Sequence, residues 1–126
     1  MSMHMNDVIV LQRQRLVAIG VNEALFLARL EYWLDQNKGN PEFQRDGCTW
    51  CRKSYAEWQQ DLPFVSAITV RRVIAALEAQ GLIQSTSAYR RDSSEAKWYT
   101  VNQANQARLA ALEQVFDRSA ADWIAE

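Results

Sequence analysis

The 126-residue chain has one histidine and two cysteines, too few for the commonest kinds of catalytic or metal chemistry. His4 stands near the start of the chain, so a serine or cysteine triad has no well-placed base. Cys48 and Cys51 form a lone C-x-x-C, whereas a structural zinc site needs four ligands, so we expect two independent structural cysteines. Glycine-rich phosphate loops and the H-E-x-x-H zinc motif are also missing. We expect neither an enzyme nor a cofactor.

Long apolar runs are missing as well. No stretch approaches the roughly 20 apolar residues that span a bilayer, and no secretory signal pattern opens the chain. Apolar residues make up 48% and charged residues 23%, which is an ordinary globular composition and argues against disorder. The length suits one domain, residues 1–126, built on one core. We therefore expect a cytoplasmic protein that does not contact membranes.

Charge of one sign is not dominant overall, but it is unevenly distributed. The net charge is −1, whereas residues 48–101 hold seven Lys/Arg and five Asp/Glu and so carry +2. The rest of the chain, with seven basic and ten acidic residues, carries −3. The middle of the chain is therefore the section that would meet an anionic partner.

The first part of the chain predicts two helices. Residues 7–19 suggest an extended lead-in and a short helix that ends at Gly20. Asn22 is then expected to cap a helix over residues 23–37, with Glu23 near the positive end of the helix dipole. That helix is apolar almost all round, which indicates a central, buried position. Residues 38–47 hold two glycines and a proline and predict a loop.

The middle section alternates short strands and helices. "CTWCR" predicts a strand, and Ser54 with Glu57 gives a capping box for a helix that ends before Pro63. In "SAITVRRVIAALEAQGLIQ", Ser66 caps a second helix whose apolar positions recur at i, i+3, i+4 and i+7, and Gly81 ends it. "LIQST" and "KWYTV" predict two strands joined by a polar loop, and a last helix covers roughly residues 103–118.

This order predicts an α+β fold that is mainly α with a small β-sheet. Two short helices joined by a tight turn and followed by a hairpin predict a winged helix-turn-helix, with extra N- and C-terminal helices. The first strand is expected to pair with the hairpin. The alternative is a small α+β domain that uses the same geometry only to bind proteins.

A helix-turn-helix places the N-terminal residues of its second helix against base edges in the major groove. Ser66, Thr69, Arg71 and Arg72 lie on those turns, and small alanines keep the rest of the helix slim. In the expected wing and before the first helix of the motif, four more basic residues are predicted to contact the DNA backbone: Arg90, Arg91, Arg52 and Lys53. The neighbouring aromatics are interpreted mostly as core because each falls on an apolar face: Trp50, Trp58, Phe64, Trp98 and Tyr99.

The order and spacing of several short motifs resemble the winged-helix domain of phage and plasmid replication proteins, which is related to the N-terminal domain of DnaD-like replisome organisers. These motifs, within residues 20–102, are "GVNEA", "YWL", "YAEW", "PFVS", "TVRR", "LEAQGL" and "KWY". The resemblance implies sequence-specific binding of double-stranded DNA through Thr69, Arg71 and Arg72, a role in replication initiation, and assembly as a dimer. A small transcriptional repressor remains an alternative.

The last predicted helix offers a surface for such a dimer. Leu109, Leu112 and Phe116 recur at steps of three and four residues, with Trp123 as a further candidate for the same stripe. This spacing suits either packing on the domain's own core or a partner helix. The homodimer is therefore an expectation, and so are contacts with replication or transcription proteins.

Overall fold

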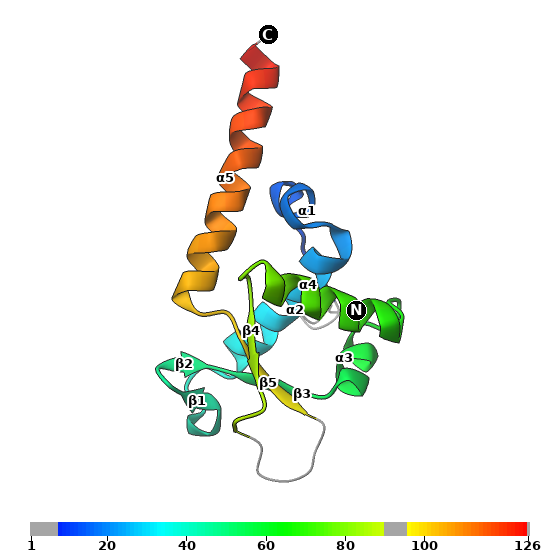
Figure 1. Ribbon diagram of the computed structural model, residues 1–126, viewed down its shortest axis with the longest axis vertical. Coiled ribbons are helices and arrows are strands. Elements are labelled where there is room, and N and C mark those ends of the chain that lie inside the picture. Colours follow the sequence, from blue (N-terminus) through cyan, green and yellow to red (C-terminus); the bar gives the residue numbers. More distant parts are fainter. Residues whose placement is uncertain (1–7, 90–95, 126) are drawn as a thin grey trace, which may run out of the picture.

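The computed structural model describes residues 8–89 and 96–125, and within the last helix it describes side chains only as far as Val115. The described part has a mixed α+β architecture, as expected, with five α-helices, one 3₁₀ helix and short antiparallel strands (Figure 1). The helices are α1 (Arg13–Ile19), α2 (Val21–Gln36), η2 (Pro41–Phe43), α3 (Tyr55–Asp61), α4 (Ala67–Ala79) and α5 (Gln103–Ala125). The strands are β1 (Gln44–Arg45), β2 (Cys48–Thr49), β3 (Cys51–Lys53), β4 (Gln84–Thr86) and β5 (Lys97–Thr100).

α2 is the central helix, as its apolar sequence predicts. It packs against α1, α4, β3 and β5, and its buried residues include Phe26, Leu27 and Leu30. The prediction that Asn22 caps this helix is wrong, because the helix already begins at Val21 after Gly20. Gly20 has φ 97°, and a Cβ there would lie 2.6 Å from Glu23 Oε2. Glycine lets the chain turn directly from α1 into α2.

The predicted strand "CTWCR" is divided into two strands that belong to different sheets. β2 pairs with β1 in a small hairpin, whereas β3 joins a three-stranded sheet in the order β3-β5-β4. Trp50 separates them: its backbone N–H donates to Phe43 O at 2.8 Å and its indole Nε1 donates to Arg45 O at 2.9 Å. The pairing of the first strand with the later hairpin is confirmed, with Cys51 opposite Tyr99.

The turn at residues 62–66 joins α3 to α4 and is fixed by local hydrogen bonds. The capping box between Ser54 and Glu57 opens α3, and the Ser66 side chain accepts from the backbone N–H of Thr69 to open α4. Within the turn, Gln59 Nε2 donates to the carbonyl of Val65. α4 ends at Ala79 and is followed by Gly81 at φ 73°, the glycine expected after a helix. The two helices therefore have a defined relative orientation.

A buried ion pair fastens α3 to α2. Arg29 Nε lies 2.8 Å from Asp61 Oδ2, and Arg29 Nη2 donates to Asp61 Oδ1 at the same distance. Trp33 Nε1 also donates to Asp61 Oδ2, at 3.3 Å. The hydrogen bonds that Arg29 donates to the Asp61 carboxylate raise the pKa of the guanidinium above its ordinary value, so it stays charged. The apolar pattern of α2 does not predict that Arg29 is buried.

α5 is longer than its apolar pattern predicts, extending past residue 118 to Ala125. Asn102 and Asn105 exchange side-chain-to-backbone hydrogen bonds at its start, and Asn105 Nδ2 donates to Gly81 O at 2.7 Å. Leu109 is buried and Leu112 half-buried, and α5 packs against α1. Beyond this contact the helix rises away from the rest of the protein (Figure 1). The side chains of Phe116 and Trp123 lie outside the described residues. Among the described helices, none has the length and apolar character needed to cross a membrane.

Candidate nucleic-acid interface

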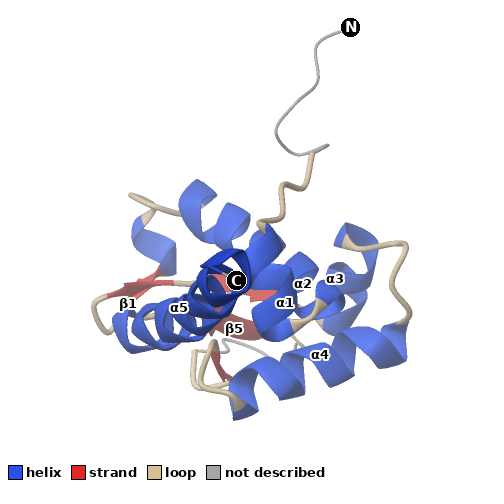
Figure 2. Cartoon of the chain, turned by 90° about the horizontal axis from the view of Figure 1, so that it is seen from above, coloured by secondary structure: helices blue, strands red, loops and turns tan. Residues whose placement is uncertain are grey.

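α4 turns one side towards the core and leaves the other accessible. Val70, Val73, Ile74 and Leu77 are buried on α2 and α3, whereas Ile68, Arg71, Arg72 and Ala75 are exposed. Figure 2 shows α4 along one edge of the protein, and none of the other described helices covers this outward side. No Asp or Glu stands between Asp61 and Glu78 in the sequence. The outward face of the N-terminal half of α4 is therefore basic and free of acidic residues.

Ser66, which is exposed, and Thr69, which is half-buried, are joined by hydrogen bonds at the start of this face. Ser66 Oγ donates to Thr69 Oγ1 at 2.8 Å and accepts from the Thr69 backbone N–H at 3.2 Å. Thr69 is half-buried on the flank of α4. Thr69 precedes Arg72 by three residues and so lies next to it on the helix, but it is less exposed than Arg71 and Arg72, with which it was grouped. Its hydroxyl already has a partner in the cap of the helix.

Tyr55, the first residue of α3, connects two basic side chains from different elements. The guanidinium carbon of Arg71 lies 4.7 Å from the centre of the Tyr55 ring. Lys97 Nζ, from β5, lies 3.4 Å from Tyr55 Oη. Contact with the ring face stabilises a cation without neutralising it. α3, α4 and the sheet thus bring Arg71 and Lys97 to one aromatic side chain.

A second lysine lies beside Lys97 in the sheet. Lys53 of β3 is the cross-strand partner of Lys97. Like charges in directly opposed positions destabilise a sheet. Lys53 Nζ lies 4.2 Å from the centre of the Trp33 ring, which offsets part of this cost. Within the part of the chain that the structure describes, neither lysine nor Arg71 nor Arg72 forms an ion pair. These cations can therefore meet an external anion.

Of the remaining predicted contacts, Arg52 lies apart from this cluster. Arg52 alternates with Lys53 along β3, so it points to the other face of the sheet. Its Nη1 atom lies 3.6 Å from Glu42 Oε1, beside η2. Arg90 and Arg91 lie outside the described residues. Of the predicted set, the structure places Arg71, Arg72 and Lys53 on or beside the basic face. Tyr55 and Lys97 were not among the predicted site residues, because only the sheet register and the packing of α3 against α4 place them beside Arg71.

Two large apolar side chains near the start of α4 are exposed, and one of them, Phe64, was expected in the core. Phe64 is 63% exposed in the turn before α4, so its assignment to the core is wrong, whereas Trp50, Trp58, Trp98 and Tyr99 are buried as predicted. Ile68 is 81% exposed. Its spacing from Arg71, Arg72 and Ala75 is i, i+3, i+4 and i+7, which would have placed it on their face.

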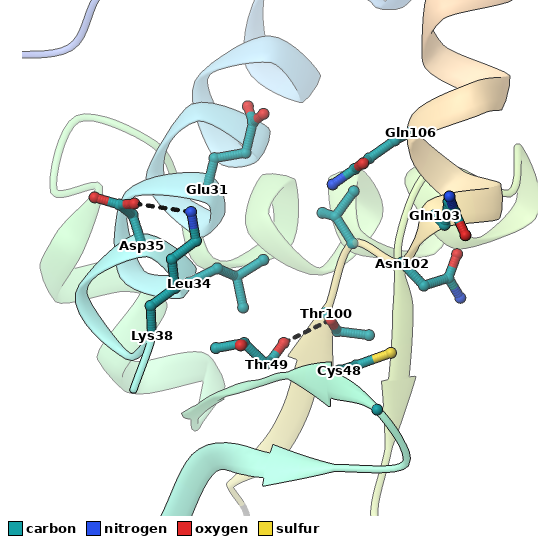
Figure 3. A pocket seen from close by; sticks show the side chains of 12 residues that line it. Glu31, Leu34, Asp35, Lys38, Cys48, Thr49, Thr100, Asn102, Gln103 and Gln106 are labelled. Carbon is teal, nitrogen blue, oxygen red and sulfur yellow. Dashed lines mark hydrogen bonds and ion pairs between the residues drawn. The ribbon is translucent and has the colours of Figure 1, made fainter. Parts of the chain in front are cut away.

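A shallow cavity of about 370 Å³ lies elsewhere, between α2, β2 and the start of α5 (Figure 3). Its lining includes two carboxylates, and both are already paired. Asp35 Oδ1 lies 3.3 Å from Lys38 Nζ, and Glu31 accepts from Arg15. No residue of α3 or α4 lines it. Both carboxylates that line the cavity are therefore already paired. The cavity is also separate from α4 and its exposed arginines.

The two cysteines occupy different environments, and the described residues contain no group of three metal-binding side chains. Cys51 is buried, and burial raises the pKa of its thiol to about 12. We expect iodoacetamide at neutral pH to modify Cys48 readily and Cys51 only after unfolding, because the thiolate is the reactive form. Peptide mass spectrometry with and without denaturant measures this difference. Equal labelling of both cysteines in the native protein would contradict it.

Comparison with family models, with curated proteins and with solved structures finds no match to this chain.

Proposed function

We propose that the chain binds double-stranded DNA sequence-specifically as a winged helix-turn-helix. In this proposal α3, the turn at 62–66 and α4 form the helix-turn-helix, and β4 with β5 forms the wing. The single observation that carries it is the exposed, acid-free face of α4 with Arg71 and Arg72, extended by Lys53 and Lys97. A basic residue that served only to stabilise the fold would be expected to pair with an acidic residue. These four basic residues form no ion pair among the described residues.

The N-terminal half of α4 enters the major groove in this account. Arg72 points outward and carries a fork of donors that fits the guanine edge. Arg71 and Lys97 meet around Tyr55 at the side of α4, where they suit backbone phosphates. Ala67 and Ala75 are exposed and small, so the helix axis can come close to the bases.

The process that this binding serves is replication initiation of a phage, plasmid or other mobile element. The sequence resemblance supports this assignment. Transcriptional repression would use the same DNA-binding surface. Mapping the bound sites separates the two: repeats beside a replication origin support initiation, whereas a single site over a promoter supports repression.

A titration of fluorescent duplex at several salt concentrations tests the DNA-binding proposal. We expect binding to a random-sequence duplex at low salt, with log K falling against log[salt] by about 0.9 for each phosphate contacted. Absence of binding to random and selected duplexes at low salt would contradict the proposal and favour a protein-binding role for the same face.

Replacing Lys97 by glutamine separates a functional role from a structural one. We expect the salt slope to fall by about one unit because one phosphate contact is lost. The melting temperature is not expected to fall, since the substitution removes the repulsion with Lys53 across the sheet. Lys38→Gln, at an exposed lysine on the rim of the cavity, is the control and should leave the slope unchanged. An unchanged slope in Lys97→Gln would remove Lys97 from the interface.

A homodimer through α1 and α5 is part of the proposal. Four of the six exposed large apolar side chains of the described residues belong to these helices or their flanks: Val10, Val17, Val21 and Val115. A two-fold dimer would set two copies of α4 about one DNA turn, roughly 34 Å, apart. We expect light scattering to show a dimer at micromolar concentration and a monomer for Val17→Glu with Val115→Glu. Ile68→Glu, at the other apolar group, should stay dimeric. A monomeric wild-type protein would contradict this prediction.

A further inference from the structure

Two large apolar side chains are exposed at the start of α4, far in the sequence from the valines of α1 and α5. Ile68 is 81% exposed in the first turn of the helix, and Phe64 is 63% exposed in the preceding turn. Neither belongs to the core, and the core contacts of α4 come from Val70, Val73, Ile74 and Leu77. Exposed apolar groups of this kind mark a contact surface.

The surroundings of Ile68 indicate what covers it. Arg71 and Arg72 follow on the same exposed side, and the stretch between Asp61 and Glu78 has no acidic residue. The partner must therefore be anionic and yet present an apolar group where a helix can reach it. In the major groove, thymine does this through its 5-methyl group, which lies among base edges flanked by phosphates.

The helical spacing gives the position of this thymine. Ile68 and Arg72 are four residues apart, so their Cβ atoms lie about 5–6 Å from each other along one line of the helix. Successive bases on a strand are separated by about 3.4 Å. If Arg72 reads a guanine, Ile68 reaches the base one or two steps away.

We propose that Ile68 is a specificity-determining residue that contacts the 5-methyl group of a thymine one or two base steps from the guanine bound by Arg72. This inference rests on the proposed DNA-binding function and adds a base identity to it. Phe64 adds a second apolar side chain at the same end of α4.

Deoxyuridine substitution tests the contact, because uracil differs from thymine only by the methyl group. The tightest-binding duplex is first recovered from a random-sequence library, and each thymine is then replaced singly by deoxyuridine. We expect the dissociation constant of the wild-type protein to rise about fourfold at one or two positions, the effect of losing one buried methylene-sized group. Ile68→Ala should bind the original duplex more weakly and lose its sensitivity at those positions. Gln80→Ala, at an exposed position just after the far end of α4, is the control and should behave as wild type.

The possible failures are distinguishable. If wild type binds duplex with the expected salt dependence but no deoxyuridine changes its affinity, DNA binding stands and the methyl contact is wrong. The methyl contact is also wrong if the library yields no preferred sequence, or if Ile68→Ala keeps the full deoxyuridine effect. If wild type binds no duplex at all, the proposed function and this inference both fail. Because Ile68 is largely exposed, its replacement should not affect folding, which circular dichroism checks.

Discussion

Replacing Arg72 by alanine is expected to weaken binding to the preferred duplex by about 1–3 kcal/mol and to flatten the preference among sequences. The reason is geometric. Arg72 is exposed on the outward side of α4, one helical turn after Ile68, and forms no ion pair within the described residues. A bidentate contact with guanine is lost without any loss of core packing. Competition between the preferred and a scrambled duplex measures both effects at once.

Lys38→Ala is the control, because Lys38 is an exposed basic residue on the rim of the cavity, which no residue of α3 or α4 lines. It should leave both affinity and sequence preference unchanged. If Arg72→Ala weakens preferred and scrambled duplexes equally, Arg72 binds phosphate, and another residue reads the sequence.

Replacing Asp61 by alanine is expected to lower the free energy of unfolding by about 3–5 kcal/mol. The side chains of Arg29 and Asp61 are only 4% and 11% exposed and share two hydrogen bonds of 2.8 Å. The variant leaves a buried guanidinium without this carboxylate and also removes the acceptor of the Trp33 indole. Since Asp61 ends α3, the loss also loosens the attachment of the helix pair to α2. Urea denaturation monitored by circular dichroism measures the change.

Asp35→Ala provides the comparison for an exposed ion pair. Its side chain is 69% exposed and that of Lys38 is 73% exposed, so solvent screens their attraction. We expect a change of less than about 1 kcal/mol. An equally small change in Asp61→Ala would mean that the buried pair contributes little to the stability of the fold.

The elements that depend on local signals could be predicted from the sequence. The capping box of Ser54 and Glu57, the cap of Ser66 and the apolar spacing of α4 each involve residues within a few positions of one another. The pairing of β3 with β5 was also expected, because short strands on either side of a helix pair have few other partners. These features define the position of Arg71 and Arg72.

The remaining features depend on contacts between distant residues. The register that brings Lys53 opposite Lys97 and the position of Tyr55 between Arg71 and Lys97 follow from the packing of three elements. Likewise, Arg29 is buried beside Asp61, which is thirty-two residues away in the sequence and adjacent in space. Phe64 looks like a core residue by composition, but the turn leaves it in solvent.

An NMR titration of the ¹⁵N-labelled protein with the preferred duplex tests whether α4 and the neighbouring lysines form the DNA-binding surface. We predict that the largest shift changes fall on residues 64–75 and on Lys53 and Lys97, with few changes around the cavity lined by Glu31, Asp35 and Gln106. Changes centred on that cavity, or on α1 and α5 alone, would contradict the account, and so would a spectrum that the duplex leaves unaltered.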